Sequence, residues 1–134
     1  MESVLQLITP KKGTHYLLDT STIRQALEKF DVHKFSVVPL LSKDGRYVGT
    51  LSEGDILRFI KNHAHFDISL AENVQVKAIE HYRPYKCLKI DATIQEVYVL
   101  TLDQNFVPLI DDQDHYIGII KRRDVLMYLG QRKK

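Results

Sequence analysis

The chain has 134 residues, which is long enough for one compact domain or for two small halves that must pack together. Its composition, 44% hydrophobic and 27% charged, is that of an ordinary globular protein, and a net charge of +2 is too small to indicate nucleic-acid binding by itself. No apolar run approaches the roughly 20 residues of a membrane span and Cys87 is the only cysteine, so we expect a cytoplasmic protein without membrane contact or an intrachain disulfide.

The N-terminal part of the chain is expected to form two helices with a short strand between them. Residues 1–8 read as a short opening helix, and residues 14–18 form a strand candidate after a basic turn. Thr22 and Gln25 have the spacing of a capping box, and apolar residues then recur at i, i+3, i+4 and i+7 from Ile23. This pattern predicts an amphipathic helix that starts at Ile23.

Two strands joined by a hairpin are predicted next. Residues 35–41 are rich in β-branched and apolar side chains, residues 42–45 supply a turn, and the second strand covers residues 46–51. Pro39 removes one hydrogen-bond donor from the first of these strands. We therefore expect Pro39 at a sheet edge or where the backbone faces a ligand.

Residues 47–57 are the most informative stretch, because a strand there runs through a glycine directly into an amphipathic helix. Ser52 can act as the N-cap of that helix, and Asp55 falls in its first turn, where unpaired N–H groups and the helix dipole favour an acceptor. A strand that ends on a helix N-terminus is also a place where a phosphate or a ribose can be held. Ser52 and Asp55 therefore have both a structural and a ligand-binding interpretation.

A near copy of this stretch returns at residues 116–126, and the capping residues and the proline return in the same order. Asp19 aligns with Asp91 and Pro39 with Pro108, so the register drifts by only about three positions. We interpret the chain as two strand-helix-strand-strand-helix repeats, each too small to bury its sheet face alone.

The predicted boundaries of these repeats follow the pattern in the sequence. The first repeat, with the opening helix, covers residues 1–65, a weakly patterned linker covers residues 66–73, and the second repeat covers residues 74–134. The fold class is therefore α+β.

Together these residues resemble a known family, the cystathionine-β-synthase (CBS) domain pair, also called a Bateman module. The resemblance rests on residues 22–27, 37–40 and 45–55 with their counterparts in the second half, and it covers essentially the whole chain. It implies two β-α-β-β-α repeats packed about a pseudo-twofold axis, with a nucleotide cleft between them. It also implies a homodimer.

The family signature is a glycine, a hydrophobic residue, any residue, a serine or threonine, any two residues, and an aspartate. In the family the hydroxyl lies near a phosphate and the aspartate lies on the ribose of an adenine nucleotide, and Gly49, Ser52 and Asp55 keep this signature complete. The adenine is implied to lie between the Val38-Pro39 strand and the backbone that enters the first strand. The candidate ligand contacts in the two halves are Thr14, His15, Tyr16, Val38, Pro39, Ser52, Asp55, Lys86, Val107, Pro108, Lys121, Arg122, Arg123 and Asp124.

The second half departs from the signature, because Lys121 stands where the hydroxyl is expected. Three cations in a row, at residues 121–123, oppose the dipole of a helix N-terminus unless an anion is present. The second site therefore either takes a phosphate-rich ligand or has lost its nucleotide, and by base rate the three cations form a solvated face. We favour the phosphate-rich ligand.

No catalytic constellation emerges from the sequence, so we do not expect an enzyme. His63 and His65 cannot share a helical face, and no metal site is expected. The first hypothesis is a regulatory module without an obligatory cofactor that binds AMP, ADP or ATP and signals its level to a separate, unidentified protein.

Two alternatives stay open. One is a sensor of cyclic di-AMP, whose phosphates residues 121–123 would hold. The other is a dimeric scaffold with degenerate ligand sites. Nucleic-acid binding is a weaker interpretation, because the other basic residues are scattered.

Overall fold

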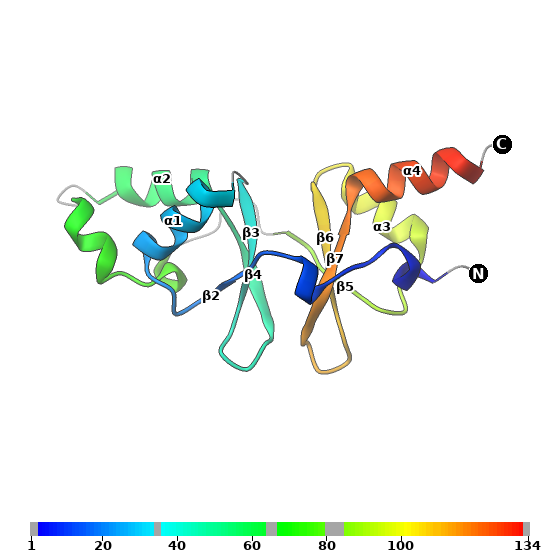
Figure 1. Cartoon of the computed structure of the whole chain (residues 1–134), viewed down its shortest axis with the longest axis horizontal. Coiled ribbons are helices and arrows are strands. Elements are labelled where there is room, and N and C mark those ends of the chain that lie inside the picture. Colours follow the sequence, from blue (N-terminus) through cyan, green and yellow to red (C-terminus); the bar gives the residue numbers. More distant parts are fainter. Residues whose placement is uncertain (1–2, 34–35, 64–66, 80–84, 133–134) are drawn as a thin grey trace. The chain divides into compact units, whose positions relative to one another are not determined.

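The computed structural model describes residues 3–33, 36–63, 67–79 and 85–132. The chain forms two compact units, one of His15–Pro84 and one of Met1–Thr14 with Tyr85–Lys134. Among the described residues, each unit holds one small sheet and two α-helices (Figure 1).

The unit His15–Pro84 is built on a sheet in the order β2-β3-β4, in which β2 and β3 are parallel and β3 and β4 are antiparallel. Helix α1 connects the two parallel strands, and α2 follows β4 directly. The strands are β2 (Leu17–Leu18), β3 (Val37–Leu41) and β4 (Tyr47–Ser52). The helices are α1 (Ile23–His33), α2 (Glu53–Lys61) and the 3-10 helices η3 (Ile68–Glu72) and η4 (Val76–Ala78).

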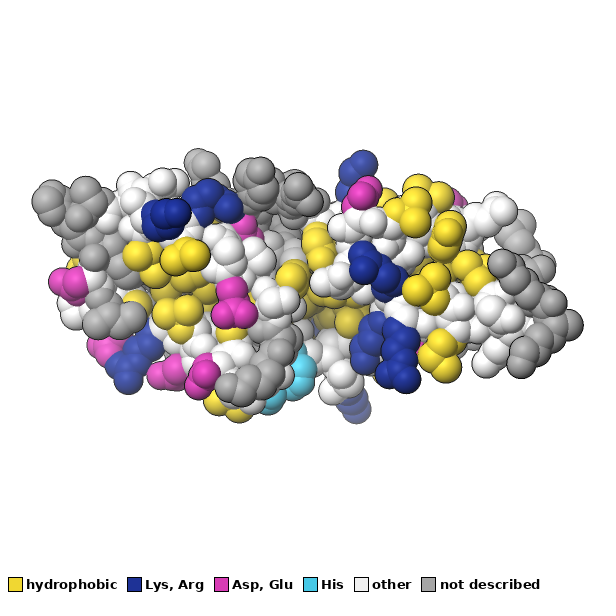
Figure 2. Space-filling model, turned by 90° about the horizontal axis from the view of Figure 1, so that it is seen from above, with side chains coloured by type: hydrophobic (Ala, Val, Ile, Leu, Met, Phe, Trp, Pro, Cys, Tyr) yellow, Lys and Arg dark blue, Asp and Glu magenta, His cyan; other side chains and the backbone are white. Residues whose placement is uncertain are grey.

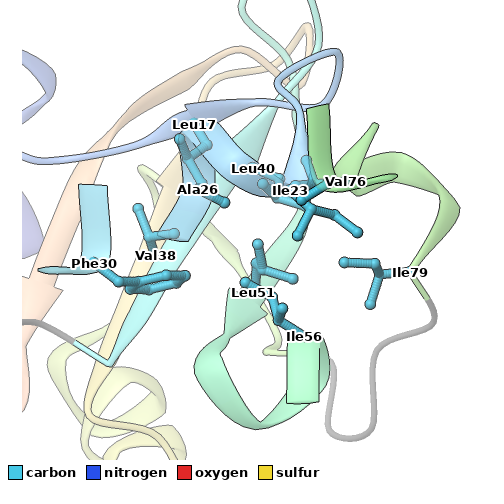
Figure 3. Packing of buried hydrophobic residues seen from close by; sticks show 11 residues of the cluster. Leu17, Ile23, Ala26, Phe30, Val38, Leu40, Leu51, Ile56, Val76 and Ile79 are labelled. Atoms are coloured by element: carbon cyan, nitrogen blue, oxygen red, sulfur yellow. The ribbon is translucent and has the colours of Figure 1, made fainter. Parts of the chain in front are cut away.

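The core of this unit includes side chains from a segment that the sequence pattern assigns to the second repeat. Figure 3 shows Val76 and Ile79 beside Ile23 of α1 and Ile56 of α2, and all four side chains are buried. Backbone hydrogen bonds from Val76 N to the Ser21 oxygen (2.8 Å) and from Ile23 N to the Val74 oxygen (2.9 Å) hold this segment against α1. The first repeat therefore buries its helices with the help of residues that follow it.

The other unit is built on a sheet in the order β1-β7-β6-β5, with β5 and β6 parallel and the remaining pairs antiparallel. The strands are β1 (Thr9–Pro10), β5 (Leu88–Lys89), β6 (Phe106–Ile110) and β7 (Tyr116–Lys121). The helices are α3 (Ile94–Thr101), α4 (Arg122–Arg132) and the 3-10 helices η1 (Val4–Leu7) and η2 (Lys11–Gly13).

The N-terminal segment of the chain completes this second unit. Thr9 and Pro10 pair with Ile119 and Gly118 at the edge of β7, and the Val4 side chain is fully buried in the core. Val4 thus has the same role in this unit that Val76 has in the other.

The predicted order of elements is confirmed in both repeats, as β2-α1-β3-β4-α2 and β5-α3-β6-β7-α4. The opening segment forms only a single short 3-10 helix, because Val4 is buried there while the next residue, Leu5, is 46% exposed and gives a longer helix little to pack.

The predicted linker, residues 66–73, contains η3, and its residue 66 lies outside the described residues. The predicted boundaries 1–65 and 74–134 follow the sequence repeat. The compact units differ from them, because residues 1–14 belong with the second repeat and residues 74–84 with the first. No described helix has both the length and the apolar character needed to cross a bilayer.

Pro39 and Pro108 both lie in middle strands, one residue before the pairing with the parallel neighbouring strand begins. Pro39 pairs with Thr50 of β4, whereas the pairing of β3 with β2 starts at Leu40, opposite Leu17. Pro108 has the same place in β6, one residue before the paired Leu109. The missing N–H therefore falls just before the pairing with the parallel strand begins, whereas the predicted sheet-edge position of Pro39 is wrong, because β3 is the middle strand of its sheet.

Candidate functional site

The junction of β4 and α2 forms a complete capping box. The Ser52 hydroxyl accepts a hydrogen bond from Asp55 N (3.1 Å), and Asp55 Oδ2 accepts one from Ser52 N (2.9 Å). Two N–H groups that the helix cannot pair internally are thereby satisfied. The prediction that Ser52 is an N-cap is confirmed, and the structural interpretation of Asp55 holds whatever else the carboxylate binds.

Asp55 is also the acidic half of an ion pair. Its side chain is 6% exposed, and the Arg58 guanidinium donates a hydrogen bond of 2.6 Å to Oδ1. A buried carboxylate is stable in its charged form only when charges and donors replace water. Arg58 was not predicted as a site residue, although its i, i+3 spacing from Asp55 on a helix is a signal that could have found it.

A pocket of about 420 Å³ opens beside this ion pair, within the size range of small-ligand sites. The carboxylate can accept hydrogen bonds from hydroxyl groups, and the guanidinium can donate to an anion. His63 lies at the same pocket, with Nδ1 2.7 Å from the Phe59 oxygen. The lining residues are Asp55, Arg58, Phe59, Asn62, His63, Ala78 and Ile79.

The described part of the chain contains no group of three or more His, Cys, Asp or Glu side chains that could hold a metal ion. His65, the second residue of the histidine pair considered in the sequence, lies outside the described residues.

The segment that enters β2 carries two of the predicted ligand contacts, and α1 covers it. Lys29 Nζ donates to the Tyr16 backbone oxygen and lies 5.6 Å from the centre of the Tyr16 ring. The ring centres of His15 and His33 are 4.0 Å apart. Lys29 and His33 are one turn apart on α1, and no pattern in the sequence indicates that they meet residues 15 and 16.

We expect the pKa of His15 to lie below its ordinary value of 6.5, mainly because the ring is partly removed from water and further because His33 and Lys29 repel its charged form. The unfolded chain then binds the proton more readily. The contribution of His15 to stability is therefore fully present above pH 6.5 and is lost as the pH falls through the lower pKa of the folded state. An NMR titration of the ring measures this pKa, and His33→Gln should move it upward. An unchanged pKa in that variant would contradict the assignment.

The other predicted contacts of the first half lie at separate places. Val38 and Pro39 are buried in β3. Thr14 belongs to the unit that contains β7, where its hydroxyl oxygen accepts a hydrogen bond from the Tyr116 hydroxyl at 2.9 Å. Within the unit His15–Pro84 the structure brings Ser52 and Asp55 into direct contact.

At the second junction one of the three cations has a structural partner. Arg122 Nε donates a hydrogen bond of 2.7 Å to the oxygen of Thr101, the last residue of α3. A cation there pairs an orphan carbonyl and complements the helix dipole. Lys121 and Arg123 are exposed. The phosphate-binding role of these three residues stays a prediction.

The remaining candidates of the second half are Lys86, Val107, Pro108 and Asp124. Val107 and Pro108 are buried in β6, and both backbone groups of Lys86 bind the Gln104 side-chain amide, at 2.8 and 3.0 Å. Asp124 is half-buried in the first turn of α4 and lines a second pocket, of about 350 Å³. Within the described ranges, no hydrogen bond or ion pair reaches its carboxylate.

The sequence model of the CBS domain matches residues 8–62 and 76–131, so two copies cover most of the chain. The chain belongs to the CBS domain family. Among curated proteins, this CBS chain is 29% identical over 125 residues to a Methanocaldococcus jannaschii protein named only as uncharacterized, covering 72% of this chain and 74% of that protein. It is 23% identical over 116 residues to subunit gamma-3 of the bovine 5'-AMP-activated protein kinase, covering 84% of this chain. It spans 23% of the length of that subunit.

Solved structures of similar CBS proteins share the fold of this chain. CbpB in complex with c-di-AMP has a TM-score of 0.86 and 24% identity, covering 97% of this chain and 85% of CbpB. CBSX2 in complex with AMP, a protein of Arabidopsis thaliana, has a TM-score of 0.77 and 21% identity, and the match covers 100% of both chains. The predicted tandem of CBS repeats is confirmed by these matches and by the family model.

Proposed function

We propose that this CBS chain is a non-catalytic regulatory module that binds an adenine nucleotide and signals its level to a separate partner protein. The observation that carries the proposal is the Asp55–Arg58 ion pair, which lines a pocket of about 420 Å³. An acceptor and a donor of opposite charge, both held in place by the fold, match the hydroxyls and the phosphate of a nucleotide.

The capping role of Asp55 is compatible with ribose binding. A carboxylate can accept about four hydrogen bonds, so the bonds from Ser52 N and Arg58 are compatible with a further bond from a ribose hydroxyl. The same bonds fix the orientation of the carboxylate before a ligand arrives, which reduces the entropy lost on binding.

Two further observations support the proposal. Proteins of the same family and fold have been crystallised with AMP and with c-di-AMP. The ionisable side chains of the pocket are engaged in structural bonds, Asp55 with Ser52 and Arg58, and His63 with the Phe59 oxygen. Such groups suit binding better than proton transfer.

The second candidate ligand is cyclic di-AMP, which CbpB binds. The observation in its favour is the exposure of Lys121 and Arg123 at the start of α4, where two cations could meet a second phosphate.

Isothermal titration calorimetry of the full chain with AMP, ATP and cyclic di-AMP separates these functions. We expect AMP or ATP to bind at least about tenfold more tightly than cyclic di-AMP, a difference of about 1.4 kcal/mol. The reverse order would favour the cyclic dinucleotide. No binding of any of the three would leave the dimeric scaffold as the surviving hypothesis.

A homodimer remains part of the proposal. Figure 2 shows hydrophobic side chains exposed on both halves of the face that it draws. In the unit that contains α3 and α4, Val99, Leu102 and Leu126 are each more than half exposed. Several large apolar side chains exposed on one unit are a feature of interaction sites. Light scattering at low and high protein concentration tests the proposal, and a monomer at both concentrations would exclude it.

A further inference from the structure

The two pockets occupy the same position in the two repeats. Each lies beside the helix that follows the glycine-containing strand, and each is lined by the signature aspartate, by an aromatic residue four positions later and by an amide residue seven positions later. These residues are Asp55, Phe59 and Asn62 in the first pocket and Asp124, Tyr128 and Gln131 in the second. The two pockets therefore have equivalent lining positions. The positions where their residues differ indicate which ligand groups each pocket can bind.

One lining position changes charge between the pockets. Arg58 lies one helical turn after Asp55, and Met127 lies one turn after Asp124. In the first pocket the carboxylate is compensated by the guanidinium. In the second, the described lining residues include no cation, and the carboxylate of Asp124 has no hydrogen-bond or ion-pair partner among the residues that the structure describes.

This difference acts directly on phosphate binding. A guanidinium has five N–H donors in a planar fork and can bind a phosphate through two parallel hydrogen bonds while still donating to a neighbouring carboxylate. Met127 offers only a thioether, and Asp124, which has no ion-pair partner among the described residues, repels an anion. Lys121 and Arg123 precede Asp124 on the chain, but neither lines the second pocket.

We propose that Arg58 is the specificity-determining residue for phosphorylated ligands, so that the chain binds one nucleotide phosphate, in the first-repeat pocket, and none in the second. This inference rests on the proposed nucleotide-binding function. It adds the number of phosphate-binding sites and the residue that recognises the phosphate. It replaces the hypothesis of a phosphate-rich second site with a site that lacks its phosphate contact.

Calorimetry with AMP and adenosine as probes tests the inference on the full chain and on two exchange variants. For the natural chain we expect one AMP per chain. Arg58→Met should weaken AMP binding by about tenfold or more, the effect of losing a charge-assisted hydrogen bond, and adenosine binding by no more than about threefold. Met127→Arg should create a second AMP site and raise the stoichiometry to two.

Two outcomes would overturn the inference while leaving the proposed function intact. One is the binding of two AMP molecules by the natural chain. The other is an equal loss of AMP and adenosine affinity in Arg58→Met, which would mean that Arg58 acts only by positioning Asp55. If neither probe binds the natural chain, the inference and the proposed nucleotide function both fall.

A further variant guards against a misfolding artefact. Arg58→Lys keeps the charge but not the planar fork, so it should retain more AMP affinity than Arg58→Met. Thermal unfolding of each variant shows whether it is folded at the titration temperature. The second site gained by Met127→Arg cannot arise from loss of structure, so failure to gain it in a folded variant would also overturn the inference.

Discussion

Replacing Gly118 with alanine is expected to destabilise the unit that contains β7 by roughly 3 kcal/mol. A Cβ at this position would lie 2.3 Å from the backbone oxygen of Thr9 and 3.0 Å from two side-chain carbons of Ile8. The backbone also has φ = 153°, a conformation that side chains rarely adopt. Since the close atom belongs to the backbone of β1, the strand must move away from β7 or the φ angle must change.

Urea unfolding followed by circular dichroism measures this loss, and hydrogen exchange of the amides in β1 and β7 locates it. Gly130→Ala is the matched control, because this glycine lies in α4 and an added Cβ would meet nothing within 4 Å. Alanine favours a helix over glycine by about 0.5–1 kcal/mol, so the control should be slightly stabilising. Equal effects of the two substitutions would refute the close-approach argument.

The glycine of the family signature therefore has a structural cause in the second repeat. β1 runs antiparallel beside it in the same sheet, with Pro10 opposite Gly118 in the ladder. A glycine allows this approach regardless of what the neighbouring pocket binds. In this repeat the signature thus combines a glycine that the fold requires with an aspartate whose carboxylate has no hydrogen-bond or ion-pair partner among the described residues.

The elements around the candidate site could be predicted because their signals are local. The N-cap at Ser52 and the capping box at Thr22 are predicted from spacings of three residues, and both are present in the structure. The hairpin turn at residues 42–45 is likewise fixed by neighbouring residues, with Gly45 at φ = 90°. In the second hairpin Asp114 adopts φ = 66°, a conformation that aspartate tolerates better than most side chains.

Contacts between distant parts of the sequence could not be predicted in this way. No spacing rule indicates that Thr9 pairs with Ile119, or that Val76 is buried in the first repeat rather than in the one that follows it. The contact of Lys29 with the Tyr16 oxygen depends on how α1 folds back over β2. The sequence repeat shows that the two halves are alike. It does not show that residues 1–14 belong to the unit of the second repeat, because this grouping leaves no trace in the repeat pattern.

Only part of the candidate site could be predicted, because some of its contacts join residues that are distant in sequence. Ser52 and Asp55 are neighbours in sequence and were identified together, whereas the role of Arg122 at the end of α3 depends on a contact with Thr101. The ligand assignments of these residues remain predictions, and the acid at position 55 is where they can be tested most directly.

Asp55→Ala is expected to weaken AMP binding by about 100-fold and to lower the free energy of unfolding by about 1–3 kcal/mol. The first effect follows from losing a charged acceptor for ribose hydroxyls, because hydrogen bonds to charged groups contribute about 1.5–3 kcal/mol each. The second follows from losing the reciprocal cap of α2 and the partner of Arg58. Calorimetry with AMP and urea unfolding of the same protein sample measure both effects.

The capping effect can be separated from the ligand effect with Thr22→Ala. Thr22 and Gln25 form an equivalent reciprocal cap on α1, with bonds of 2.9 and 3.2 Å, in the same compact unit. Neither residue is a candidate ligand contact, so this variant should lose about 1 kcal/mol of stability and keep its affinity for AMP. If Thr22→Ala loses as much affinity as Asp55→Ala, the aspartate acts through stability alone. If Asp55→Ala binds AMP like the natural chain, Asp55 is a helix cap and the ribose assignment is wrong.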